Sequence, residues 1–267
     1  MSPDWDPALY NRFRRYRAEP AEMILRRLKI AQADSILDLG CGTGEHTVEL
    51  ARRAASGSAL GIDSSRAMVA EANKLRATLD PSLADRVRFE LGDLTALGSD
   101  RQFSIIFSNA ALQWARDHQA CLACWFDALK VGGQLVVQMP ANDQETAQLS
   151  LLALCRESPW SEWVGKTVVP SGAVRTPEQY RGMLSALGYC EIDCYYRTFA
   201  HPMTSPAEIV EWSRATLLRP FLNRIPKIRH AAFINEWTQR LESNYGTTGP
   251  LTFNFTRLFL WARRPST

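Results

Sequence analysis

The glycine-rich heptapeptide at residues 38–44 constrains this chain more than any other part of its sequence. It has the sequence Asp38-Leu39-Gly40-Cys41-Gly42-Thr43-Gly44, between an apolar run and a helical pattern. Glycine tolerates positive φ and lets a ligand approach the backbone, and the N-terminus of a following helix offers free N–H groups. The heptapeptide therefore predicts a strand, a tight loop and a helix that bind a nucleotide-like cofactor.

Short β-rich runs alternate with helical patterns over the first 140 residues. Strands are predicted at 35–39, 58–62, 87–91, 104–108 and 134–139. Helices are predicted at 45–53, 65–78 and 119–129, and Gly132-Gly133 predicts a turn into the fifth strand. This alternation is typical of an α/β fold in which a parallel sheet is covered on both faces.

The alternation stops at Ala141. A long, weakly periodic stretch precedes a predicted helix at 177–187, and two further strands are predicted at 191–198 and 256–262, with helical segments at 206–218 and 226–245 between them. Long irregular stretches in compact chains are often functional. We interpret residues 1–267 as a single domain in which residues 1–30, 141–185 and 202–250 form a substrate cap.

Composition indicates an ordinary globular protein. The 267 residues are 46% hydrophobic and 22% charged, and the net charge of +3 is spread along the chain. We therefore predict no nucleic-acid partner. Neither a signal-like start nor an apolar run of about 20 residues is found, which predicts a cytoplasmic protein without a membrane partner.

The six cysteines are scattered, so reduced thiols are expected. Cys121 and Cys124 form a CxxC pair that Cys190 and Cys194 would in principle complete as a zinc site. The first pair lies in a helical pattern beside Trp125 and Phe126. We therefore favour buried small side chains and predict no metal.

Two acidic residues decide which cofactor the loop suits. A dinucleotide fingerprint needs a small residue where Glu45 stands, and a carboxylate there would repel a pyrophosphate. Asp38, at the end of the first strand, is a suitable partner for the ammonium of an amino-acid moiety. The pattern favours S-adenosylmethionine over NAD.

Two more carboxylates end the next two strands. Asp63 lies about 20 residues beyond the loop, where a carboxylate accepts both ribose hydroxyls, and Asp93 suits the adenine amino group. Either aspartate alone has the alternative role of capping a helix or closing a turn. Three acids that end successive parallel strands nevertheless open onto one crevice.

The sequence resembles the class I methyltransferases, and more closely the trans-aconitate methyltransferase family. The resemblance is nearly end to end and rests on these residues: Trp5 to Tyr10 with Phe13, Arg17 and Pro20; Asp38 to Gly44; Gly61 to Ser65 with Met68; Asn109-Ala110, Leu112-Gln113-Trp114 and Asp117-His118; Val137 to Pro140 with Asn142; Leu218-Arg219-Pro220; Arg257-Leu258-Phe259 and Ala262-Arg263-Arg264.

The resemblance implies a Rossmann-like, seven-stranded sheet with an antiparallel final hairpin, and methylation of a carboxylate on a small tricarboxylic acid. The expected cofactor-binding residues are Asp38, Gly40, Cys41, Gly42, Gly44, Asp63, Ser64, Asp93, Leu94, Asn109 and Trp114. For Trp114 the alternative is a core side chain with its N–H satisfied internally.

A polyanionic acceptor calls for forked cationic donors. The candidates for acceptor binding are Tyr10, Arg17, Gln113, Arg175, Tyr180, Arg219 and Arg257, although each arginine is otherwise a surface group. A carboxylate nucleophile is ionised at neutral pH and needs no general base, so no acid or base is assigned. His118 is interpreted as packing at a helix start.

Three other functions stay open at this point. The acceptor is a more apolar metabolite if Trp160, Trp163, Trp212, Phe221 and Phe253 line its pocket. The chain is a non-catalytic S-adenosylmethionine-binding protein if that pocket is filled. RNA methylation is disfavoured by the small charge excess. The sequence leaves the oligomeric state undetermined.

Overall fold

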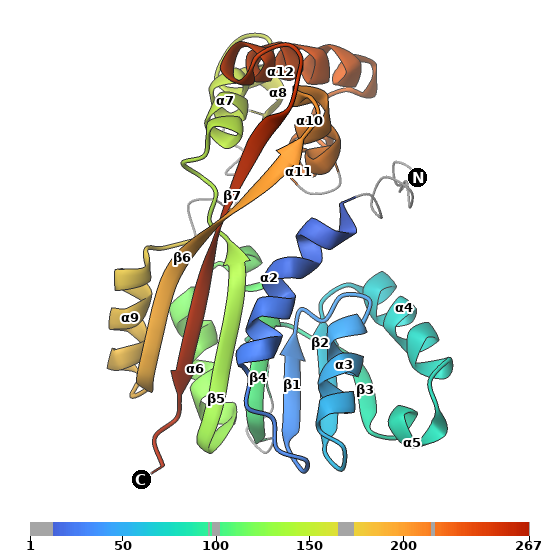
Figure 1. Cartoon of the computed structure of the whole chain (residues 1–267), viewed down its shortest axis with the longest axis vertical. Coiled ribbons are helices and arrows are strands. Elements are labelled where there is room, and N and C mark those ends of the chain that lie inside the picture. Colours follow the sequence, from blue (N-terminus) through green and yellow to red (C-terminus); the bar gives the residue numbers. More distant parts are fainter. Residues whose placement is uncertain (1–12, 96, 98–101, 165–173, 215–216, 267) are drawn as a thin grey trace. The chain divides into compact units, whose positions relative to one another are not determined.

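The computed structural model (Figure 1) describes residues 13–95, 97, 102–164, 174–214 and 217–266, and the side chains of all of these except Arg14, Arg15 and Arg17. Contacts divide the chain into two compact units. Unit 1 comprises Met1–Pro20, Ala141–Gly172 and Thr198–Arg257, and unit 2 comprises Ala21–Pro140, Ala173–Arg197 and Leu258–Thr267.

A mixed sheet of seven strands forms the framework. Its strands are β1 (Ser35–Leu39), β2 (Ser58–Asp63), β3 (Val87–Leu91), β4 (Phe103–Asn109), β5 (Leu129–Pro140), β6 (Cys190–Met203) and β7 (Leu251–Arg263). They lie in the order β3-β2-β1-β4-β5-β7-β6. The first five pair in parallel, and β7 runs against β5 and β6 (Figure 1). The predicted fold class and antiparallel final hairpin are confirmed.

Continuous apolar runs place β1 and β4 at the centre of this sheet. Ile36, Leu37, Ile105 and Phe107 are fully buried. A parallel strand that is covered on both faces needs such a run rather than an alternation of apolar and polar residues. Asp38 interrupts the run of β1 and is itself buried, which marks it as a residue with a special role.

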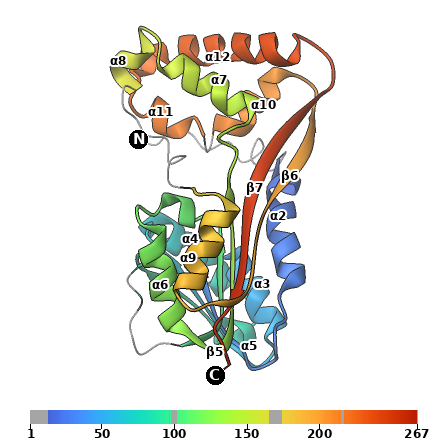
Figure 2. The same cartoon turned by 90° about the vertical axis from the view of Figure 1, so that its left-hand side faces the viewer.

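Helices of unit 2 cover both faces of the sheet. They are α3 (Glu45–Arg53), α4 (Arg66–Ala77), α5 (Pro81–Ala84), α6 (His118–Ala128) and α9 (Pro177–Ala186), while α2 (Arg14–Arg27) begins in unit 1 and ends in unit 2. Figure 2 shows α3 on one face and α6 with α9 on the other. Asp117 caps α6 by accepting the N–H of Ala120, and Thr176 with Gln179 forms a capping box on α9.

Unit 1 contains a helical core of its own. Its complete helices are α7 (Thr146–Cys155), α8 (Trp160–Val164), α10 (Pro206–Arg214), α11 (Arg219–Leu222) and α12 (His230–Tyr245), with the 3₁₀ turn η3 (Lys227–Arg229). The aromatic side chains of Trp160, Phe233 and Trp237 are buried together. The indole of Trp237 donates to Ser150 of α7, and that of Trp160 donates to Glu236 of α12.

Several elements differ from the sequence-based predictions. Helix α7 lies in the stretch that we expected to be irregular: its sequence is apolar on nearly all sides, so it has no amphipathic period. Helix α2 contains Pro20, which normally ends a helix. Strand β5 includes Gly132-Gly133, where we predicted a turn, and a register shift against β4 absorbs the extra residues. Strands β6 and β7 are longer than predicted.

The single domain with a cap stays a prediction. The helix α9 and residues 21–30, which we assigned to the cap, group by their contacts with unit 2.

Truncation of Phe107 tests the central position of β4. Phe107→Ala leaves a cavity in a fully buried site, so we expect the free energy of unfolding to fall by about 3–5 kcal/mol. Urea denaturation measures this change. The control is Val131→Ala on β5, where the side chain is 63% exposed and the loss should stay within about 0.5 kcal/mol. Equal losses in the two variants would contradict the buried position of β4.

Candidate functional site

The predicted loop forms at the carboxyl end of β1, between that strand and α3. Gly40, Gly42 and Gly44 all have positive φ, at 75°, 55° and 90°. The N–H groups of Gly40 and Cys41 both donate to the carbonyl of Ile62, at 2.8 and 3.1 Å. The loop is thereby fixed to the end of β2.

The three glycines are needed for different reasons. A Cβ on Gly40 would lie 2.2 Å from the Cβ of Ala111, and one on Gly44 would lie 2.5 Å from the ring of Phe89. A Cβ on Gly42 would meet nothing within 4 Å. Gly40 and Gly44 therefore permit close packing inside the protein, whereas Gly42 faces open space where a ligand can approach the backbone.

Asp38 is a buried carboxyl at the base of the loop. Its side chain is 2% exposed and accepts a 2.6 Å hydrogen bond from the hydroxyl of Thr47 on α3. Burial raises the pKa of Asp38 to about 7; the Thr47 hydrogen bond opposes this effect and the charge of Asp63 adds to it. Asp38 is thus an acid that a cation would readily ionise.

Asp63 connects the loop to the helix that follows β2. One carboxylate oxygen accepts the N–H of Gly42 at 3.0 Å, and the other accepts the N–H of Ser65 at 2.8 Å. Ser64 lies between Asp63 and Ser65 in the sequence, and Ser65 caps α4. Each carboxylate oxygen accepts more than one hydrogen bond, so these contacts leave capacity for ligand hydroxyls.

Asp93 lies beyond the end of β3 and is exposed. Its Oδ1 accepts both the N–H and the hydroxyl of Thr95, at 2.9 and 2.6 Å, and these two hydrogen bonds lower the pKa of Asp93. The turn-closing role is therefore present, and Oδ2 is left for a ligand. The carbonyl of the neighbouring Leu94 accepts the indole N–H of Trp125 at 2.7 Å.

A strained turn follows β4. Ala110 has a φ of 55° although it is not glycine, and its N–H donates to the backbone carbonyl of Gln138 at 2.7 Å. The amide N–H of Gln113 donates to the carbonyl of Ala110, while Oε1 of Gln113 and Oδ1 of Asn109 are buried without a hydrogen-bond partner in the described part of the chain. Such atoms call for a ligand or a water molecule.

Trp114 ends the 3₁₀ turn η1 (Leu112–Trp114) and is 60% exposed. The alternative that it is a core tryptophan is therefore wrong, and its indole is available on the surface of unit 2.

Two candidates for acceptor binding lie together near α9. Tyr180 is fully buried, and its hydroxyl pairs with Nδ1 of His118 and accepts the N–H of Arg175 at 3.5 Å. The Arg175 side chain is exposed, and its charge acts on both His118 and Tyr180. The hydroxyl of Tyr180 is thus occupied within the protein, and its contact with an acceptor stays a prediction.

Unit 1 contains the other two described candidates. Arg219 begins α11, is exposed, and has no salt bridge within the described residues. Arg257 of β7 is 6% exposed and lies 4.7 Å above the ring of Phe255. The burial of His201, together with the nearby charge of Arg257, lowers the pKa of His201 to about 4. Tyr10 and the side chain of Arg17 lie outside the described residues.

Sequence reasoning missed the contacts that support the site. Thr47 binds Asp38, and His118 pairs with Tyr180 across 62 positions of the chain. No local motif predicts either contact, because the partners meet only after helices pack on the sheet.

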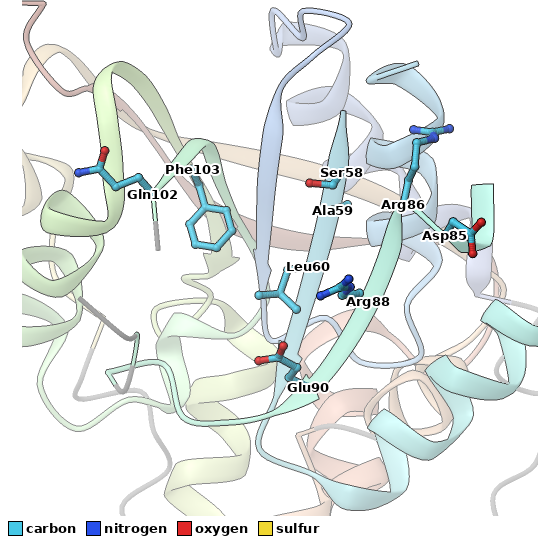
Figure 3. Close-up of a pocket in the computed structure, with 9 residues that line it drawn as sticks. All are labelled: Ser58, Ala59, Leu60, Asp85, Arg86, Arg88, Glu90, Gln102 and Phe103. Carbon is cyan, nitrogen blue, oxygen red and sulfur yellow. The ribbon is translucent and has the colours of Figure 1, made fainter. Parts of the chain in front are cut away.

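A cavity of about 480 Å³ lies away from all predicted site residues. It is lined by Ser58, Ala59, Leu60, Asp85, Arg86, Arg88, Glu90, Gln102 and Phe103 (Figure 3). One nitrogen of Arg86 donates to the carbonyls of Ala51, Ala54 and Gly57. The cavity thus has mixed charge, and its Arg86 already has partners in the protein.

The described residues contain no cluster of three or more metal-ligating side chains, and none of their helices is long and apolar enough to span a membrane. All six cysteines are free thiols.

Alanine substitutions distinguish the two kinds of glycine. We expect Gly40→Ala to lower the free energy of unfolding by more than about 2 kcal/mol, since both the positive φ and the contact with Ala111 oppose a Cβ. Gly42→Ala should cost about 1 kcal/mol, because only its φ opposes the substitution. Thermal and urea unfolding of the free protein measure both values. Equal losses would show that Gly40 is not packed against Ala111.

Comparisons with known proteins agree with this geometry. Residues 30–181 match a family described as a methyltransferase domain. The chain is 34% identical to the trans-aconitate 2-methyltransferase of Variovorax paradoxus (strain S110) and 36% identical to that of Escherichia coli O1:K1 / APEC, with 98% of each chain covered.

A solved structure supports the fold. The phosphoethanolamine N-methyltransferase 2 of Haemonchus contortus, in complex with S-adenosyl-L-methionine, matches with a TM-score of 0.57 and 20% identity, over 92% of this chain and 52% of that one. The chain therefore belongs to the trans-aconitate 2-methyltransferase family of S-adenosylmethionine-dependent methyltransferases.

Proposed function

We propose that this enzyme methylates a carboxylate of trans-aconitate, or of a closely similar small polycarboxylate, to give a monomethyl ester. The names of the curated relatives, at 31–36% identity over nearly the full chain, support this acceptor. The observation that carries the proposal is the glycine loop of unit 2, in which an open Gly42 adjoins Asp38 and Asp63.

The residues at this loop fit S-adenosylmethionine. Gly42 leaves its backbone accessible, two carboxylates lie beside it, and Asn109 and Gln113 have buried oxygens without partners in the described residues. The ligand has an ammonium, two ribose hydroxyls and an adenine amino group, all of which are hydrogen-bond donors. An acceptor-rich site is therefore complementary to it.

We assign one ligand group to each acid. Asp38 binds the ammonium, directly or through water, because a buried carboxyl gains most from a paired cation. Asp63 accepts the ribose hydroxyls, and Asp93 accepts the adenine amino group with the oxygen that Thr95 leaves unused. Trp114 and Asn109 complete the wall of the site at the end of β4.

The bound cofactor supplies an electrophilic methyl group. The remaining task of the protein is to hold the acceptor in line with that group and to exclude water, which supplies several kcal/mol through effective molarity. A carboxylate with a reference pKa of about 4 is ionised at neutral pH. No side chain therefore has to remove a proton.

Recognition of the acceptor calls for cations. Arg219 is exposed without a salt bridge in the described residues, and Arg257 and Arg175 supply two further guanidinium groups. Guanidinium groups bind carboxylates with two parallel hydrogen bonds. We propose a small carboxylate as the partner, with neither nucleic acid nor a membrane, and a cytoplasmic location that suits six free thiols.

The ionisation of Asp38 makes cofactor affinity pH-dependent. Below about pH 7 the free protein carries a protonated Asp38, so binding of the ammonium must displace that proton. We expect the Kd for S-adenosylmethionine to fall by up to tenfold per pH unit as pH rises from 5.5 to about 7, and then to level off. Isothermal titration calorimetry measures this profile.

Asp38→Asn is the matched control, since it keeps the shape and accepts the Thr47 hydrogen bond. Its Kd should be roughly 10- to 100-fold higher at pH 7.5 and nearly constant with pH. The folded pKa lies above the ordinary value of 3.8, so the free wild-type protein should also lose stability as pH rises from about 4 to 7, and the variant should not. A pH-independent Kd in the wild type would contradict the ammonium assignment.

The acceptor assignment is tested with a panel of acids. Purified protein and S-adenosylmethionine are incubated with trans-aconitate, cis-aconitate, citrate, isocitrate and apolar acids, and esters are detected by mass spectrometry. We expect ester on trans-aconitate, and a fall of roughly 100-fold in kcat/KM for Arg219→Ala. Arg229→Ala, which removes another exposed arginine of unit 1, is the control and should change it less than twofold. Turnover only on apolar acids would overturn the proposal.

A further inference from the structure

The turn between β4 and α6 carries two of the predicted site residues, Gln113 and Trp114. On one side, the Cβ of Ala111 lies against Gly40 of the loop so closely that the glycine has no room for a side chain. At its start, Ala110 has a strained positive φ. A strained backbone persists only when its surroundings hold it in place.

His118 follows this turn in the chain and lies buried beside it. Its ring is 4% exposed and stacks on that of Tyr180, with 5.9 Å between the ring centres and 19° between the planes. Nδ1 of the ring pairs with the hydroxyl of Tyr180 on α9. The carbonyls of Ala115 and Leu112, which belong to the turn, also act on the ring.

We assign one tautomer to His118 from the hydrogen bonds around Tyr180. The N–H of Arg175 donates to the Tyr180 oxygen, and the Tyr180 O–H then donates to Nδ1, a far better acceptor than the sulfur of Met139 at 3.8 Å. Burial and the charge of Arg175 lower the pKa of His118. We therefore assign a neutral ring with its hydrogen on Nε2.

Nε2 of His118 is buried and completes no hydrogen bond within the described residues. An N–H in that position lacks a full partner, which is unfavourable for a buried donor. The backbone of the turn at Ala115 and Leu112 interacts with this same ring, so the imidazole is in contact with the turn as well as with Tyr180.

We propose that His118, fixed by Tyr180, is a positioning residue for methyl transfer: it supports the turn at residues 110–115 and thereby places Gln113 and Trp114. The inference rests on the proposed function, because it assumes that these two residues face cofactor or acceptor. Neither His118 nor Tyr180 contacts the reacting atoms in this scheme.

Tyr180→Phe removes only the hydroxyl, and the chain offers a close control. Tyr189 is also buried, and its hydroxyl donates to the carbonyl of Leu122 on the same helix α6 at 2.9 Å. Each Tyr→Phe change removes one buried hydrogen bond, so the two variants should lose stability to a similar extent. We expect kcat/KM for the acceptor to fall about tenfold in Tyr180→Phe, and less than twofold in Tyr189→Phe.

Two further measurements separate positioning from general loss of stability. The indole N–H resonance of Trp114 in the ligand-free protein, assigned with Trp114→Phe, should shift in Tyr180→Phe and His118→Ala but not in Tyr189→Phe. In a double-mutant cycle, Gln113→Ala should be non-additive with Tyr180→Phe and additive with Tyr189→Phe.

The outcomes distinguish this inference from the function on which it rests. If the wild type transfers methyl groups and both Tyr→Phe variants retain the same activity, the positioning role is wrong and the proposed function stands. If the wild type methylates none of the acids, the proposed function fails, whereas the shift of the Trp114 resonance still reports whether His118 and Tyr180 hold the turn. An unshifted resonance overturns the inference in either case.

Discussion

The close approach of Gly40 to Ala111 is the contact on which the candidate cofactor site of unit 2 depends. It joins the loop after β1 to the turn after β4, two adjacent parallel strands whose carboxyl ends lie at one edge of the sheet. The hydrogen bonds from the loop to Ile62 add the end of β2 to the same assembly. Three chain segments are thereby held together by packing, and the residues that they carry need no ligand to bring them together.

Electrostatics at the loop favour a cationic ligand group. Asp38 is buried next to the carboxylate of Asp63, so burial and a like charge both resist its ionisation. A folded protein keeps such a group at a cost to its own stability, and a bound ammonium relieves that cost. The same arrangement opposes anionic phosphates, which agrees with the choice of S-adenosylmethionine over NAD that Glu45 suggested from the sequence.

Prediction from sequence succeeded where a local pattern has a direct structural cause. The bounds of β1, β3 and α3 agree with those predicted. Strand β1 is a nearly continuous apolar run, the edge strand β3 alternates apolar with charged residues, and α3 follows directly from the glycine loop. It failed for α7, which is apolar on its exposed side as well, where Leu149 lies, and so has no amphipathic period, and for α2, where Pro20 lies inside a helix. In both helices tertiary packing overrides the local signal.

The sequence by itself determined the fold class, the placement of three acids after successive strands and the family, since each follows from local spacing or from residues shared along the whole chain. Only the tertiary structure decided that Trp114 is exposed, that Tyr180 is buried with its hydroxyl on His118, and that Thr47 binds Asp38. These facts depend on contacts between residues far apart in the chain. Side-chain burial and hydrogen-bond partners are set when helices pack on the sheet, and local sequence carries no record of that packing.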